Sequence, residues 1–87
     1  MTLTVAESPL VSGTTIQVCA SGDAQGTVTV TVDNGAQPTP ETQTIEVPIG
    51  GDGSGCASWT VPAWELANFN APGCEEQTRR IVPGTTP

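Results

Sequence analysis

The sequence of 87 residues predicts an all-β fold, a single antiparallel β-sandwich of about seven short strands. Three observations predict it: apolar and polar residues alternate with a period of two, the polar partner is usually threonine, and turn-forming residues separate the runs. The length suits one domain with a thin core, since a domain of this size buries only about 60 to 65% of the surface that its unfolded chain exposes.

The clearest alternation covers residues 27–32, where three valines occupy one face and three threonines the other. The same period predicts further strands near residues 3–5, 16–20, 45–49, 57–61, 67–71 and 76–82. Successive side chains of a strand point to opposite faces. We therefore expect one set to be buried: Val28, Val30, Val32 and Trp59. The outward set is Thr27, Thr29 and Thr31.

Gly, Asp, Asn, Ser and Pro cluster between these segments, as expected of turns. Two prolines exclude residues 38–41 from a central strand, so this stretch is predicted as an edge or a long connection. One short helical turn is expected at residues 62–66, because proline suits the first position of a helix. The predicted sandwich spans residues 1–82, and residues 83–87 are predicted to be an extended tail that docks onto a partner.

The number and spacing of the strands resemble those of immunoglobulin-like domains over residues 3–82. The resemblance implies that the connections after the second, fourth and sixth strands gather at one end of the sandwich. Two features depart from the antibody pattern. Cys19 lies in the outward register of the second strand and the sixth strand offers Phe69, where antibodies have inward cysteines, and the third strand lacks a Trp. An immunoglobulin-like architecture is implied without the antibody core, and a fold alone does not define function.

In that strand order, Cys19 ends the second strand, Cys56 opens the fifth and Cys74 follows the turn after the sixth. Cys19 and Cys56 would then face each other across an antiparallel pair on the outer face. Three interpretations stay open: a Cys19–Cys56 disulfide with one free thiol, three free thiols in a protein assembled in the cytoplasm, or a metal site. The sequence disfavours a metal, since it has no His and no Cys-x-x-Cys motif.

The charge balance argues against two classes of partner. Nine acidic and two basic residues give a net charge of −7, whereas nucleic acids and anionic membranes are held mainly by Lys and Arg. No apolar run approaches the roughly 18 residues of a transmembrane helix, and the N-terminal residues lack the charged and apolar regions of a signal peptide. We expect a chain that is not exported by the usual route, or one whose signal has been removed.

Catalysis and cofactor binding are not expected. The chain has no His, Lys or Tyr to act as a general base for Ser or Cys, and a small sandwich offers no deep cleft in which paired carboxylates would hydrolyse a sugar. The glycine-rich residues 50–55 lack the Gly-Lys-Ser/Thr ending of a phosphate loop and are predicted to form a hairpin turn. Asp52 alone does not make a calcium site.

The candidate partner contacts are Trp64, Arg79, Arg80, Pro83 and Pro87. Trp64 falls between strands, where capping the core and anchoring a partner are equally expected. Arg79 and Arg80 are neighbours on a strand and must point to opposite faces. They are expected to pair with carboxylates such as Glu75 or Glu76, or to contact an acidic partner.

Compact acidic sandwiches of this kind resemble the immunoglobulin-like domains of bacteriophage capsids and tails. The resemblance implies a non-enzymatic virion accessory protein, a decoration or minor capsid protein at the virion surface. It would bind the major capsid protein or another virion protein, and would stabilise the shell or present an adhesive surface. The alternative is an extracellular adhesin or carbohydrate-binding module of a bacterial surface protein. Self-association is also open, because a thin sandwich exposes edge strands.

Overall fold

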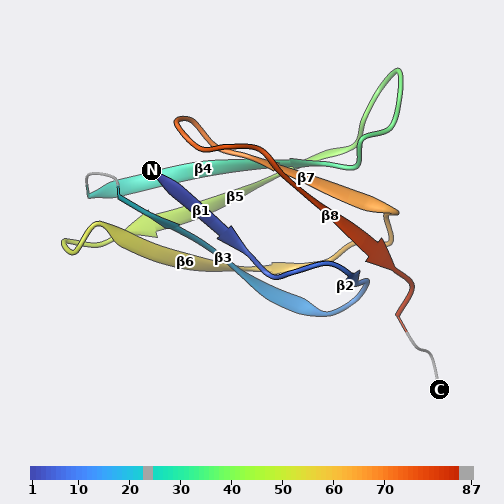
Figure 1. Ribbon diagram of the computed structural model, residues 1–87, viewed down its shortest axis with the longest axis horizontal. Helices are drawn as coiled ribbons and strands as arrows, with labels where there is room; N and C mark the ends of the chain where they lie inside the picture. The colour runs from blue at the N-terminus through green and yellow to red at the C-terminus, as the bar shows by residue number, and fades with distance from the viewer. Residues whose placement is uncertain (23–24, 85–87) are drawn as a thin grey trace.

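The computed structural model describes residues 1–22 and 25–84, which form eight strands and no helix. Because these residues form no helix, they include none that is long and apolar enough to cross a membrane. Figure 1 labels the strands and colours them by their order in the chain. Their bounds are β1 (Thr2–Val5), β2 (Leu10–Val11), β3 (Thr15–Ser21), β4 (Gly26–Asp33), β5 (Thr42–Ile49), β6 (Ser54–Thr60), β7 (Leu66–Asn70) and β8 (Gln77–Val82).

The strands form two sheets that pack face to face (Figure 1). One has the order β1-β3-β6 and the other has the order β2-β8-β7-β4-β5. All neighbours are antiparallel except β2 and β8, which are parallel. The chain thus crosses between the sheets several times, and both sheets contribute to a single core.

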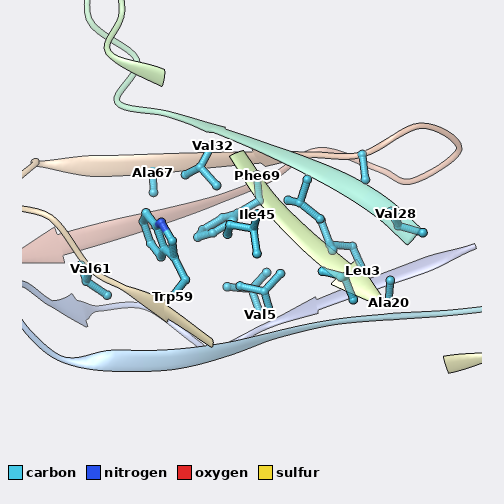
Figure 2. Packing of buried hydrophobic residues seen from close by; sticks show 14 of the residues in the cluster. Leu3, Val5, Ala20, Val28, Val32, Ile45, Trp59, Val61, Ala67 and Phe69 are labelled. Carbon is cyan, nitrogen blue, oxygen red and sulfur yellow. The ribbon is translucent and has the colours of Figure 1, made fainter. Parts of the chain in front are cut away.

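The core consists of the inward-facing residues of both sheets, and no buried residue of the described chain is polar or charged. Figure 2 shows the Trp59 ring between the two sheets, with Val5 and Leu3 on one side and Val32 and Ala67 on the other. The buried residues are Leu3, Val5, Leu10, Val18, Ala20, Val28, Val30, Val32, Ile45, Val47, Ile49, Trp59, Val61, Ala67, Phe69, Ala71 and Ile81.

The predicted register is confirmed. Trp59 is 6% exposed, and the three alternating valines of β4 are all buried. Thr27 and Thr29 are exposed and Thr31 is partly exposed, on the opposite face of β4. Seven of the eight strands coincide with predicted segments. Alternation predicts these strands well because each one buries a single face.

Two predictions about local structure are wrong. The structure has an additional strand, β2, whose two residues are too few to show a period. The helical turn expected at residues 62–66 does not form. Instead, the Trp64 N–H donates to the Pro62 carbonyl across a tight turn, and the Glu65 carbonyl accepts the N–H of Ile81 on β8. Because Glu65 pairs with β8, the chain is extended here instead of helical, and it continues directly into β7, which begins at Leu66.

The C-terminal ends of β3, β5 and β7 lie toward the same end of the sandwich in Figure 1. The opposite end carries the β4–β5 connection, the β6–β7 connection and the exit of the chain from β8. The two ends differ in shape, because the β4–β5 connection extends well beyond the sheets.

Gly55 lies at a close approach between the two sheets. It pairs with Ala20 in one sheet, while its backbone faces Pro48 of β5 in the other. A Cβ atom at position 55 would overlap the Pro48 carbonyl oxygen. Only glycine therefore allows the β5–β6 hairpin to cross between sheets here.

We expect Gly55→Ala to lower the free energy of unfolding by at least about 2 kcal/mol, because backbone atoms must separate to admit the methyl group. Gly51→Ala in the same hairpin is the matched control, since a Cβ atom there meets nothing within 4 Å. Urea unfolding of both variants checks this. Equal stability of the two variants would contradict the close approach.

Candidate partner-binding surface

Three aromatic rings lead from the core to one end of the sandwich. The rings of Phe69 and Trp59 meet edge to face, with centroids 5.4 Å apart. The ring of Trp64 is tilted against that of Trp59, with centroids 6.2 Å apart. Phe69 and Trp59 are buried, whereas Trp64 is partly exposed. Trp64 therefore covers the core, which is one of the two roles that the sequence left open, and part of the residue remains accessible to solvent.

The two indole N–H groups bind acceptors beside the start of β5. Trp59 Nε1 donates to Gln43 Oε1 at 3.0 Å, and Trp64 Nε1 donates to Glu41 Oε2 at 3.0 Å. Glu41 closes the connection between β4 and β5. The Trp64 ring is thus fixed on one side by aromatic packing and on the other by a carboxylate.

The β4–β5 connection, residues 34–41, is closed at its base by Asn34. The side-chain oxygen of Asn34 accepts the N–H groups of Ala36 at 3.1 Å and Glu41 at 2.9 Å, and the Asn34 N–H donates to the Glu41 carbonyl at 3.1 Å. Residues 35–40 are all exposed. The connection is therefore braced at its base, and its proline-containing tip faces solvent.

Two hollows flank Trp64. The larger has a volume of about 370 Å³ and is lined by residues 34–36 and 63–66. The smaller has a volume of about 200 Å³ and is lined by Ser12, residues 63–65, Ile81 and Pro83. We call these lining residues together with Glu41 the Trp64 surface. It combines an aromatic ring, an apolar hollow and carboxylates at one end of the molecule.

The structure brings together some of the predicted contacts and separates others. Trp64 and Pro83 both line the smaller hollow. Arg80 is exposed and lies opposite Leu66, which lines the larger hollow. Pro87 lies outside the described residues.

The Arg79 side chain is held by hydrogen bonds within the protein. Its guanidinium donates to the Ala6 carbonyl at 2.7 Å, to the Val5 carbonyl at 3.4 Å and to Gln77 Oε1 at 2.7 Å. The Gln77 side chain in turn donates to the Leu3 carbonyl. These partners replace the expected carboxylates of Glu75 and Glu76. Arg79 and Gln77 of β8 therefore cover carbonyl groups along β1, the edge strand of the other sheet.

Arg79→Ala is expected to destabilise the protein by about 1–3 kcal/mol, because several carbonyl groups lose a charged donor. It should also promote self-association, since an uncovered edge strand can pair with another chain. Arg80→Ala is the matched control, with the same loss of charge at an exposed neighbouring position. Thermal unfolding and sedimentation of both variants measure the two effects. A larger loss with Arg80→Ala would contradict this role of Arg79.

Cys19 and Cys56 occupy directly opposed positions on β3 and β6, and a disulfide joins them. Their side chains lie on the outer face of the three-stranded sheet, among Thr, Ser and Gln residues. Cys74 is a free, partly buried thiol that packs against the core. The structure thus has the first of the three arrangements that the sequence left open.

The glycine-rich residues 50–55 form the predicted hairpin between β5 and β6. The Gly50 N–H donates to the Ser54 carbonyl at 3.0 Å, and the Gly53 N–H donates to the Gly50 carbonyl at 3.0 Å. Hydrogen bonds from the Ser54 backbone and hydroxyl lower the pKa of the exposed Asp52 carboxyl. This carboxylate therefore stabilises the hairpin turn. The turn lies at the end of the sandwich away from Trp64.

Sequence reasoning missed Glu41, Asn34 and Gln77. The Asn34-Gly35 pair indicates a turn, but nothing local indicates that Glu41 binds a Trp 23 positions away. Among residues 1–22 and 25–84, no group of three or more His, Cys, Asp or Glu side chains is placed to hold a metal. No family model, curated protein or solved structure matches this chain.

Proposed function

We propose that this protein is a non-enzymatic binding domain with an immunoglobulin-like fold, which attaches through the Trp64 surface to the outer surface of a bacteriophage capsid. The strand order supports the fold assignment. With β1, β3 and β6 taken as strands A, B and E, and β4, β5, β7 and β8 as C, C′, F and G, each of these seven strands lies in the sheet expected of that family.

The single observation that carries the binding role is the Trp64 surface. Trp is among the residues that contribute most to binding energy when an interface buries them. Here the ring is held by Glu41 and Trp59, so little side-chain freedom remains to be lost on binding. A protruding loop on one side and Pro83 on the other extend the contact area.

The outer surface of a capsid is a suitable location for two reasons. The disulfide requires an oxidising environment, which a virion surface provides after release from the cell. The net charge of −7 keeps the domain soluble and disfavours contact with the packaged nucleic acid. The domain would be a decoration or minor capsid protein that contacts the major capsid protein or another virion protein.

A second function, an extracellular adhesin or carbohydrate-binding module, is favoured by a different observation. The larger hollow places Asn34 and Glu65 beside an indole ring, and polar groups beside an aromatic ring suit a sugar. A disulfide also suits an extracellular protein.

Mass spectrometry of purified phage particles and of cell envelopes from the source distinguishes the two functions. The capsid proposal expects tens to hundreds of copies per particle. Recovery only from envelopes, within a longer chain, would replace it with the adhesin proposal.

Trp64→Ala is expected to reduce binding to capsid particles at least tenfold, since it removes the central ring of the surface. Thr44→Ala, on the exposed outer face of β5, is the control and should bind normally. Co-sedimentation with particles that lack the protein measures binding, and circular dichroism checks that both variants are folded. Equal binding of the two variants would place the contact elsewhere on the domain.

A further inference from the structure

We propose that the Trp64 surface recognises an extended, basic protein segment, with one apolar side chain in the smaller hollow and Lys or Arg side chains beside it. The proposal rests on the binding role proposed above and adds the chemistry of the partner. It is carried by the apolar lining of the hollow and by the charge of its rim.

The smaller hollow suits one apolar side chain. Its lining includes Ala63, the Trp64 ring, Ile81 and Pro83, which present mainly carbon atoms. Its volume of about 200 Å³ is on the scale of a single side chain and well below the roughly 300–1,000 Å³ of typical small-molecule pockets. The hollow therefore fits an anchor residue of a protein segment better than a free ligand.

The rim of the surface is acidic. Glu65 is exposed and lines both hollows. Glu41 is exposed and accepts the Trp64 N–H through Oε2, and a carboxylate has further lone pairs to accept a cationic donor. Glu41 is hydrogen-bonded to the ring and Glu65 lines both hollows, so a cation bound to either carboxylate would lie beside a side chain in the smaller hollow.

The chain has few cations of its own to neutralise this rim. Arg79 is engaged by carbonyl groups along β1. Arg80 lies opposite Leu66 at the edge of the larger hollow and is the one cation placed near the surface by strand pairing. Its single positive charge is smaller than the combined charge of the Glu41 and Glu65 carboxylates, so the surface stays acidic. Complementarity of potential then favours a basic partner segment.

The test uses the full chain and three blocked pentapeptides, Gly-Lys-Leu-Lys-Gly, Gly-Glu-Leu-Glu-Gly and Gly-Lys-Ser-Lys-Gly. The two indole N–H resonances are followed by NMR and assigned with Trp64→Phe. We expect the first peptide to shift the Trp64 resonance at millimolar concentration. The serine peptide should bind about tenfold more weakly, because the apolar anchor is missing. The glutamate peptide should produce no shift.

Single substitutions of glutamate residues test which carboxylates attract the lysine side chains of the peptide. Glu65→Gln and Glu41→Gln are each expected to weaken binding of the first peptide about two- to fivefold, as for exposed ion pairs. Glu75→Gln changes the net charge equally at the other end of the sandwich, where it lines a hollow with Met1, and should have no effect. High salt should weaken the interaction.

Equal shifts with the acidic and basic peptides, or equal effects of Glu75→Gln and Glu65→Gln, would overturn the proposal. The absence of any peptide shift would overturn it as well. If the protein nevertheless co-purifies with capsids and Trp64→Ala abolishes that association, the capsid function stands and only the basic-segment inference fails. A Trp64 shift with a neutral oligosaccharide and not with the basic peptide would favour a glycan partner.

Discussion

Replacing both Cys19 and Cys56 with serine is expected to lower the free energy of unfolding by about 2–4 kcal/mol. The disulfide joins residues 37 positions apart, so reduction or replacement frees a long segment of the unfolded chain. In a domain of this size each kcal/mol shifts the melting temperature by about 4–8 °C. The double variant should therefore melt at least roughly 8 °C below the wild type, as measured by circular dichroism.

Serine is a suitable replacement because the neighbouring side chains on this face are already hydroxyl and amide groups. Thr15 and Gln17 of β3 contact Thr60 and Ser58 of β6 across the same pair of strands. The folded state should thus accept the change, and the loss of stability should come mainly from the unfolded state. Such a loss is a substantial part of the roughly 5–15 kcal/mol that stabilises a typical domain.

The control for this prediction is Cys74→Ser, which removes the free thiol and leaves the disulfide in place. This change should also be present in the background of the double variant, to prevent exchange among thiols. The melting temperature of the Cys74→Ser protein should fall on addition of a reductant, whereas that of the triple variant should not. Identical melting temperatures of the two proteins under oxidising conditions would contradict a stabilising bridge.

Trp59→Ala is expected to destabilise the protein by about 3–5 kcal/mol. The indole is the largest side chain of the core and contacts the rings of both Phe69 and Trp64. Its removal would leave a cavity between the sheets and also withdraw support from Trp64. Urea unfolding measures the stability, and the fluorescence of the remaining Trp64 should shift to longer wavelength as its ring becomes more hydrated.

Trp59→Phe is the matched variant. It keeps an aromatic ring in the core but loses the hydrogen bond to Gln43, an exposed residue that water can satisfy. Its loss of stability should therefore be clearly smaller than that of Trp59→Ala. A cost below about 1 kcal/mol for Trp59→Ala would be inconsistent with a central packing role, since large-to-small changes in a closed core rarely cost so little.

Both predictions bear on the Trp64 surface. The ring of Trp64 rests on Trp59, and Trp59 rests on Phe69, so the surface depends on the order of the core beneath it. The disulfide lies on the outer face of β3 and β6, away from this chain of rings. We therefore expect loss of the disulfide to reduce stability while the native fraction still binds, and loss of Trp59 to weaken binding as well.

Much of the fold was predictable from the sequence, because the strands bury one face each. Side chains alternate along a strand with a period of two, so the Val and Thr positions of β4 directly indicate which face is buried. The outward register of Cys19 and the burial of Trp59 follow from the same rule. The charge balance likewise needs no structure, since it depends on composition alone.

The tertiary structure decided the features in which residues distant in sequence meet. The Glu41–Trp64 hydrogen bond, the pairing of Cys19 with Cys56 and the contacts of Arg79 with β1 each join segments 23 to 74 positions apart. The strand β2 and the extended path of residues 62–66 depend on pairing with β8. Local alternation carries no information about such contacts, because they are set by how the two sheets stack and by which strands become neighbours.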